Sequence, residues 1–197
     1  MFLHGRKDQG QDTNLTATIS GCDFIENEAV RGGGIYSHSA TDVEIEKFVL
    51  KPTRFIGNKS IAAGGGIGIG NRDAISTNEF RICESVFVSN EAAQGGAIHN
   101  HQGAITYAVN CVLAGNSATV QGGGVFNTRH IPTGAAAELY MHNCLIAGNV
   151  ASVGTGGGVF NGLYLDPAVM ELIQCTLLGN HAGDKYGGAV NESGDTN

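Results

Sequence analysis

The stretch Phe-Ile-Glu-Asn-Glu-Ala-Val-Arg-Gly-Gly-Gly-Ile at residues 24–35 places an asparagine and then three consecutive glycines before an apolar residue. Each glycine loses more backbone freedom on folding than any other residue, so a glycine run weakens an ordinary helix or strand. The chain nevertheless repeats this arrangement along nearly its whole length. The recurrence indicates that the glycines serve a repeated architecture.

Six copies of an apolar-x-x-Asn motif mark the repeat, and successive Asn residues lie 31, 32, 26, 33 and 31 positions apart. These marker residues are Asn27, Asn58, Asn90, Asn116, Asn149 and Asn180. A small residue stands two positions after each marker, and Gly-Gly-Gly or Gly-Gly-Ala then precedes Ile or Val. Five positions before the markers stand Cys22, Thr53, Ser85, Cys111, Cys144 and Cys175. Self-similarity at a period of about 30 residues is typical of solenoids and propellers.

Inside each unit, apolar residues alternate with polar ones, as at Ala17 and Ile19 or at Cys22 and Phe24. A period of two predicts short strands, and we expect three of them in each unit. A propeller blade is the alternative, but a blade usually takes four strands and about 40 residues. We therefore predict an all-β fold: a right-handed, single-stranded parallel β-helix, or solenoid, of about six coils, in which residues 1–197 form one domain.

In such a coil, equivalent residues stack about 4.8 Å above one another. We expect each marker Asn at a sharp bend, where it tolerates left-handed backbone angles and bonds to the main chain and to the Asn of the next coil. The small residue and the glycines are expected at corners that leave no room for a Cβ atom. A phosphate-binding loop is the alternative interpretation of the glycines, but such a loop precedes a helix, and no helical pattern follows here.

The repeat resembles two groups of bacterial proteins. Phe87-Val88-Ser89-Asn90 and Gly95-Gly96-Ala97-Ile98 match the motif pair of the chlamydial polymorphic outer-membrane protein family. Asn143-Cys144-Leu145-Ile146-Ala147-Gly148-Asn149 is similar to phrases of long bacterial surface proteins with right-handed β-helix repeats and C-terminal sorting domains. The resemblance implies a β-helix in a secreted or cell-surface protein. Pectin-lyase-like enzymes share this fold, and a fold alone does not carry an activity.

Composition argues against several classes of partner. The formal net charge is −7 and no basic stripe is present, so we do not expect nucleic acid as a partner. No run of about eighteen apolar residues occurs, so we do not expect this segment to insert into a membrane. No signal peptide is visible and neither end carries a capping helix, which together indicate a piece of a longer repeat protein.

Four of the five cysteines, Cys22, Cys111, Cys144 and Cys175, fall at one position of the repeat, and Cys83 lies nearby. A cysteine beside Phe and Leu in an inward row behaves as a small buried hydrophobe, so we expect unpaired thiols. The spacing does not fit a zinc site, and the scattered histidines form no Ser-His-Asp set with their neighbours. We therefore expect no metal and no cofactor.

Aromatic residues recur at outward positions. Directly after the inward Ile or Val of four units stand Tyr36, His99, Phe126 and Phe160, while Tyr107 and Tyr140 occupy equivalent places in adjacent coils. Exposed stacked rings can serve as platforms for glycans or for proteins of a host or cell surface. The alternative is that loops such as residues 161–167 cover the rings.

The sequence favours a structural or adhesive segment of a secreted or surface-displayed bacterial β-helix, which binds at several points along a rigid rod without catalysis. The alternative is a carbohydrate-active β-helix, either a polysaccharide lyase or a glycoside hydrolase. Such an enzyme needs carboxylates that converge from neighbouring coils. The outward positions before the Cys row hold Thr18, Val49, Arg81, Tyr107, Tyr140 and Glu171, which include no stacked carboxylates.

Overall fold

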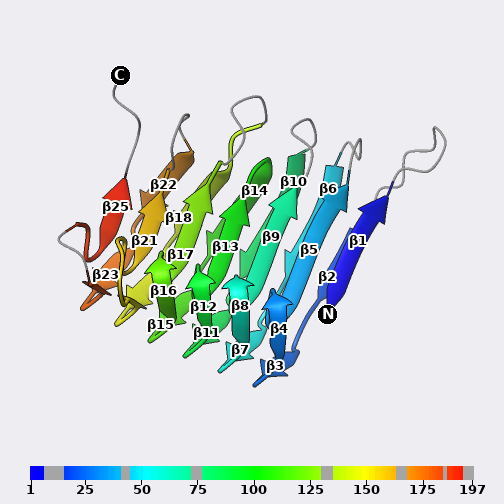
Figure 1. Cartoon of the computed structure of the whole chain (residues 1–197). Helices are drawn as coiled ribbons and strands as arrows, with labels where there is room; N and C mark the ends of the chain where they lie inside the picture. Colours follow the sequence, from blue (N-terminus) through cyan, green and yellow to red (C-terminus); the bar gives the residue numbers. More distant parts are fainter. Residues whose placement is uncertain are drawn as a thin grey trace.

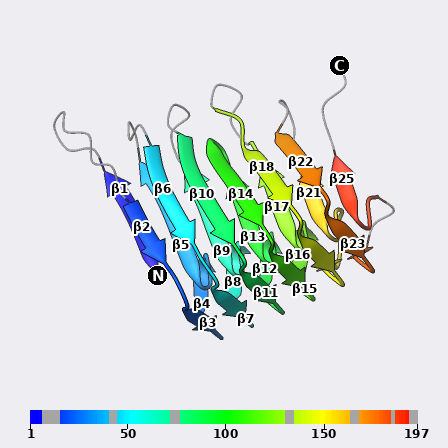
Figure 2. The same cartoon turned by 180° about the vertical axis from the view of Figure 1, so that it is seen from behind.

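The computed structural model describes residues 1–6, 16–40, 45–71, 77–129, 135–162, 168–183 and 186–192. These residues form a solenoid of short strands in four parallel sheets (Figures 1 and 2). Strands of one sheet come from successive turns of the chain, and β1 and β25 lie at opposite ends of the stack (Figure 1). The predicted all-β parallel β-helix is confirmed, and the number of coils is close to the six expected. Within the described segments there is no helix that could cross a membrane.

The chain visits the four sheets in a fixed order in each coil. Sheet A contains β1 (Phe2–Arg6), β5 (Ile35–Ala40), β9 (Ile67–Asn71), β13 (Ile98–His101), β17 (Val125–Thr128), β21 (Val159–Asn161) and β25 (Val190–Glu192). Sheet B contains β2 (Thr16–Ile19), β6 (Ile45–Leu50), β10 (Thr77–Cys83), β14 (Ala104–Val109), β18 (Glu138–His142) and β22 (Val169–Ile173).

The two remaining sheets have shorter strands. Sheet C contains β3 (Asp23–Ile25), β7 (Arg54–Ile56), β11 (Val86–Val88), β15 (Val112–Ala114), β19 (Leu145–Ala147) and β23 (Thr176–Leu178). Sheet D contains β4 (Glu28–Arg31), β8 (Lys59–Ala63), β12 (Glu91–Gln94), β16 (Ser117–Gln121), β20 (Val150–Ala151) and β24 (His181–Ala182). A coil thus has four strands where the sequence predicted three, because the residues after each marker Asn extend into sheet D instead of forming only a corner.

The core is built from aligned rows of apolar side chains. Phe24, Phe55 and Phe87 occupy one row, with ring centroids 4.9 and 4.7 Å apart in successive pairs. In later coils Leu113 and Ile146 continue that row and are fully buried. Stacking like on like lets each coil cover the apolar face of the next, so the core runs along the whole solenoid.

The marker residues form a hydrogen-bonded row through the solenoid. From Asn27 to Asn149, each side-chain Nδ2 donates to Oδ1 of the marker in the following coil, at 2.8 to 2.9 Å. The backbone N–H of the same residue donates to that oxygen as well. The four inner markers, Asn58, Asn90, Asn116 and Asn149, are buried. Their amides satisfy buried turn groups that water does not reach.

The left-handed backbone angles fall one residue earlier than expected. The residues before the markers have positive φ: Glu26 (52°), Gly57 (61°), Ser89 (55°), Gly115 (60°), Gly148 (60°) and Gly179 (61°). The prediction that the marker Asn itself adopts this conformation is wrong, because its side chain is turned inward to bond along the row. The residue before it, which is exposed in five of the six coils, makes the bend.

A different structural constraint favours glycine at each position of the Gly-Gly-Gly run. The first has positive φ, as at Gly32 (59°) and Gly64 (68°). At the second, Gly65, an added Cβ would lie 2.6 Å from the backbone nitrogen of Glu91 in the next coil. At the third, Gly66, an added Cβ would lie 2.9 Å from the Phe87 ring. Only the third position holds alanine elsewhere, at Ala97 and Ala189.

Candidate functional site

Four of the predicted aromatic residues share one outward row of sheet A. Strand register places Tyr36, Gly68, His99, Phe126 and Phe160 on successive coils. The His99 and Phe126 rings stack with centroids 5.2 Å apart, and those of Phe126 and Phe160 with centroids 5.3 Å apart. The sequence therefore brings these rings together, except where Gly68 interrupts the row.

The rings are far less exposed than a binding platform requires. Phe126 and Phe160 are only 1% and 2% exposed, and His99 is 9% exposed, whereas Tyr36 is half-buried. Stacking removes the ring faces from solvent, and the end of sheet D lies alongside, with Gln121 lining the same hollow as Phe126. The expectation of exposed rings is corrected for His99, Phe126 and Phe160, which are buried. The loop at residues 163–167, which was considered as a cover, lies outside the described residues.

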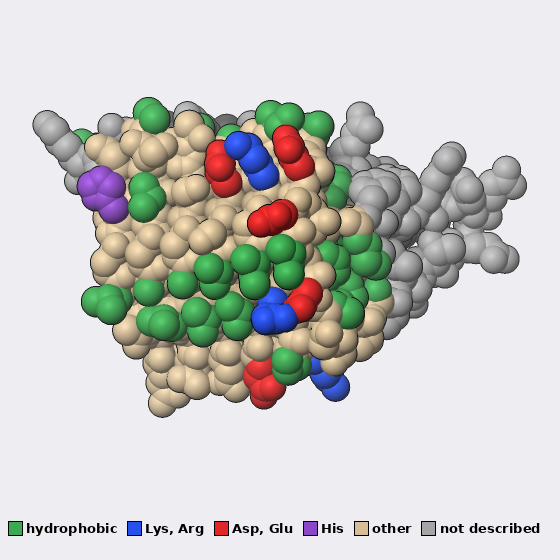
Figure 3. Space-filling model, turned by 90° about the horizontal axis from the view of Figure 1, so that it is seen from below, with side chains coloured by type: hydrophobic (Ala, Val, Ile, Leu, Met, Phe, Trp, Pro, Cys, Tyr) green, Lys and Arg blue, Asp and Glu red, His purple; other side chains and the backbone are tan. Residues whose placement is uncertain are grey.

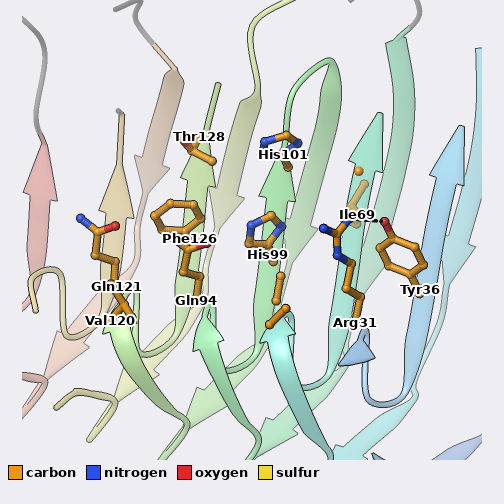
Figure 4. A pocket seen from close by; sticks show the side chains of 13 residues that line it. Arg31, Tyr36, Ile69, Gln94, His99, His101, Val120, Gln121, Phe126 and Thr128 are labelled. Carbon is orange, nitrogen blue, oxygen red and sulfur yellow. Dashed lines mark hydrogen bonds between the residues drawn. The ribbon is translucent and has the colours of Figure 1, made fainter. Parts of the chain in front are cut away.

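A groove of 480 Å³ runs between the outer face of sheet A and the ends of the sheet D strands (Figure 4). Tyr36, His99, His101, Phe126 and Thr128 line its sheet A side. Its other side is formed by residues at the ends of sheet D: Arg31, Ala62, Ala63, Gln94, Val120 and Gln121. The groove crosses four coils, which at about 4.8 Å per coil is a length of roughly 14 Å.

Small residues in the second coil produce the hollow. Gly68 and Gly70 carry no side chain on the outer face of β9, and the Tyr36 ring leans over them. An added Cβ would lie 3.0 Å from Cδ2 of Tyr36 at Gly68 and 3.6 Å from its hydroxyl oxygen at Gly70. Sheet D contributes only Ala62 and Ala63 at this level. Because Gly68 has no side chain in the aromatic row, a space remains between the rings of Tyr36 and His99.

The described lining carries one formal charge. Nη1 of Arg31 donates a hydrogen bond of 3.3 Å to the Tyr36 hydroxyl (Figure 4). Burial, together with smaller effects of the nearby His101 and Arg31, lowers the pKa of His99 to about 3, so His99 is neutral at physiological pH. The imidazole rings of His99 and His101 stack with centroids 5.5 Å apart. No Asp or Glu lies among the described residues of the groove. The groove therefore offers rings, amides and one guanidinium.

Tyr107 and Tyr140 form a second aromatic pair, on the outer face of sheet B. Their rings stack with centroids 5.0 Å apart, and the Arg81 guanidinium lies 5.3 Å from the Tyr107 centroid. The Tyr140 hydroxyl donates to Oε2 of Glu138 at 2.8 Å, and this bond raises the pKa of Tyr140 to about 12. Both rings are half-buried. This pair lies apart from the groove, on the neighbouring sheet.

Four of the five thiols occupy one row, Cys83 lies at the end of β10, and their exposure differs. Cys111 and Cys144 are buried, Cys83 and Cys175 are half-buried, and Cys22 is exposed; all five are free. A hydrogen bond with Cys144 and burial both raise the pKa of Cys111. Cys22 is exposed, contrary to the expected burial, because it lies in the first coil, at one end of its row. Among the described residues no group of three or more His, Cys, Asp or Glu side chains is placed to hold a metal ion.

A second asparagine row was missed by sequence reasoning. Asn100, Asn127 and Asn161 lie on the inner face of sheet A and are buried. Nδ2 of Asn100 donates to Oδ1 of Asn127 at 2.7 Å, and Asn127 donates likewise to Asn161 at 2.6 Å. The signal was present, since each of these residues stands two positions after the inward Ile or Val. This row fixes the strands that carry His99 and Phe126 from behind.

Comparisons of the chain with protein-family models, with curated proteins and with solved structures found no match. The resemblance to the polymorphic outer-membrane proteins and to the sorting-domain proteins therefore rests on the repeat motifs alone.

Proposed function

We propose that the protein is a structural and adhesive segment of a secreted or surface-displayed bacterial β-helix, and that the groove on sheet A binds a glycan without catalysis. The observation that carries this proposal is the lining of the groove: the half-buried Tyr36 ring, side-chain amides and one arginine around a hollow of 480 Å³. The repeat motifs similar to the polymorphic outer-membrane proteins support the cellular setting.

The chemistry of the groove suits a sugar chain. Aromatic faces pack against the apolar C–H faces of sugar rings, and Tyr36 presents such a face beside the hollow. Gln94 and Gln121 each offer an amide oxygen and an NH₂ group to ligand hydroxyls from the opposite side. Since His99 stays neutral, its lone pair is available to accept a hydrogen bond.

An extended ligand would make several weak contacts instead of one strong contact. The groove crosses four coils, and each coil adds two to four residues to its walls. On a rod with many coils, or on a surface with many rods, such contacts act together through a high effective concentration. Weak affinity at each groove is therefore compatible with firm adhesion.

The test is a binding titration of the purified protein against a panel of defined neutral and acidic oligosaccharides. We expect binding to at least one, and Tyr36→Ala should weaken it about tenfold or more, which corresponds to about 1.4 kcal/mol. Tyr186→Ala is the matched control, because Tyr186 is 66% exposed and does not line the groove. Equal affinities for the two variants, or no binding across the panel, would contradict the proposal.

Two further measurements test whether the sheet B pair is a second contact surface and whether the protein cleaves the glycan that it binds. Tyr107→Ala combined with Tyr140→Ala tests the sheet B pair: lower adhesion with unchanged melting temperature would make it a second contact surface. Analysis of the bound oligosaccharide after long incubation tests the carbohydrate-active alternative. Shortened or unsaturated products would favour that alternative over adhesion.

A further inference from the structure

The outer face of sheet C carries two parallel rows of side chains that are mostly apolar. One row, which we name the inner stripe, is apolar in all six coils: Ile25, Ile56, Val88, Ala114, Ala147 and Leu178. The other, the outer stripe, consists of Asp23, Arg54, Val86, Val112, Leu145 and Thr176. Figure 3 shows the two rows as bands of hydrophobic side chains across this face.

These stripes are open to solvent and largely free of charge. Ile25 is 48% exposed and Leu145 is 36% exposed, and the central residues of both rows are half-buried only by their neighbours. The one ion pair within them is at one end, where Nε of Arg54 donates to Oδ1 of Asp23 at 2.7 Å. Isolated exposed apolar residues are ordinary, but a contiguous apolar face marks an interaction site.

The shape of the face favours a flat partner. All strand pairs in sheet C keep one continuous register without a bulge, so the rows are straight. The turn residues beside the inner stripe are small in most coils: Gly57, Ser89, Gly115, Gly148 and Gly179. The face can therefore be approached along nearly its whole length.

We propose that this face is a self-association surface, on which a second copy of the chain packs its own sheet C face to face with the two solenoid axes antiparallel. Aligned sheets pack about 10 Å apart when their side chains interdigitate. In both faces the strands of successive coils lie about 4.8 Å apart, so every strand of one sheet C can face a strand of the other.

Side-chain size supports the antiparallel orientation. A twofold axis between the third and fourth coils sets Ile56 opposite Ala147 of the second copy and Val88 opposite Ala114 of the second copy. Large residues thus meet small ones in the four inner coils of the inner stripe, as close packing of two faces requires, and Ile25 meets Leu178 of the second copy at each end. In the outer stripe Val86 meets Val112 of the second copy, close to the axis.

Charge supports the same orientation. The antiparallel arrangement sets Glu26 opposite Gly179 of the second copy and Glu84 opposite Asn110 of the second copy, so no like charges meet. In the outer stripe it sets Asp23 opposite Thr176 and Arg54 opposite Leu145 of the second copy, so only Arg54 meets an apolar side chain. A parallel arrangement would instead cross the two rows and set both Asp23 and Arg54 against isoleucines of the second copy, which desolvates two charges and is less favourable.

The size of the face predicts a weak dimer. Six strands span about 24 Å, and the two rows are about 10 Å wide, which gives a footprint well below the roughly 800 Å² per partner of a standard interface. We therefore expect a dissociation constant between about 10 µM and about 1 mM. A dimer of this strength forms where chains are concentrated, as on a surface crowded with copies.

Sedimentation equilibrium of the whole chain from about 10 µM to about 1 mM tests the proposal. The wild-type protein should form dimers, and Val88→Lys should weaken dimerisation at least tenfold. Val150→Lys is the matched control, since Val150 faces outward from the neighbouring sheet D and should leave dimerisation unchanged; circular dichroism checks that both variants fold. A wild-type protein that stays monomeric at the highest concentration overturns the proposal. So does association that Val88→Lys leaves intact.

Cross-linking tests the orientation. With Cys22 replaced by serine, Ser89→Cys and Glu26→Cys each add one exposed thiol beside the inner stripe. In the antiparallel dimer the two copies of position 89 lie one coil apart along the axis, whereas those of position 26 lie five coils apart, about 24 Å. A short bis-maleimide should therefore join Ser89→Cys into covalent dimers and fail with Glu26→Cys. Equal yields from the two variants would refute the antiparallel arrangement.

Discussion

The carboxamide of Asn116 makes four hydrogen bonds inside the solenoid, and Asn116→Leu removes all of them while keeping a side chain of similar size. Oδ1 accepts from the backbone N–H of Asn90 at 3.0 Å and from its Nδ2 at 2.9 Å. Nδ2 donates to the Phe87 carbonyl at 3.0 Å and to Oδ1 of Asn149 at 2.9 Å. Asn116 is fully buried, so water does not replace these partners.

The expected loss follows from which groups keep a partner. Nδ2 of Asn90 still donates to the Phe55 carbonyl, and Oδ1 of Asn149 still accepts from the backbone N–H of Asn116. The N–H of Asn90 loses its acceptor and the Phe87 carbonyl loses a donor. A buried group without a partner costs about 1–3 kcal/mol, so the free energy of unfolding should fall by about 2–6 kcal/mol.

The assay is equilibrium urea denaturation of Asn116→Leu beside Asn27→Leu. Asn27 is exposed in the outermost described coil and donates to Asn58 without accepting from another marker, so its replacement should cost less than about 1 kcal/mol. Similar midpoints for the two variants would show that a buried position in the row has no energetic consequence. Our account of the Asn row would then be wrong.

Three other outcomes follow from the geometry. Gly96→Ala should abolish folding or cost several kcal/mol in a melting experiment, because its Cβ would overlap backbone atoms of the next coil, whereas Gly148→Ala, in open space at positive φ, should cost only about 1–2 kcal/mol. Native thiol titration should label Cys22 rapidly and Cys111 only on unfolding; rapid labelling of both would contradict the inward row. Between about pH 6.5 and pH 3 the unfolded chain binds a proton at His99 that the folded protein does not bind. The free energy of unfolding should therefore fall on acidification by up to about 1.4 kcal/mol per pH unit. His99→Gln should reduce this pH dependence in denaturation curves.

The sequence was sufficient to predict the fold because each repeat of the motif along the sequence forms one coil of the solenoid. Residues one period apart, such as Phe55 and Phe87, become neighbours in one row. The number of strands was harder to predict, since sheet D residues such as Ala92 follow the marker Asn within a few positions and resemble a corner. Assigning the left-handed residue failed for a related reason: Asn is common in that conformation, yet here its side chain is needed inside.

The site was only partly predictable. Alternation along β13 and β17 is enough to place His99 and Phe126 on one outward row, but their burial depends on how close sheet D approaches. No short-range pattern encodes the distance between two sheets. The gap at Gly68 likewise becomes a groove only when Tyr36 and His99 are known to flank it in space.

Every carboxamide in the marker row points the same way. From Asn27 to Asn149 each NH₂ group donates to the marker of the coil that follows, and from Asn58 to Asn180 each side-chain carbonyl oxygen accepts from the coil before. Aligned amides polarise one another, so each rung strengthens those beside it. An inverted coil would set two carbonyl oxygens, or two NH₂ groups, against each other. The rows of apolar side chains carry no such direction, so the amide row adds a polarity to the one that the parallel strand pairs already have. Together they act as a template that a coil of the same chain direction extends.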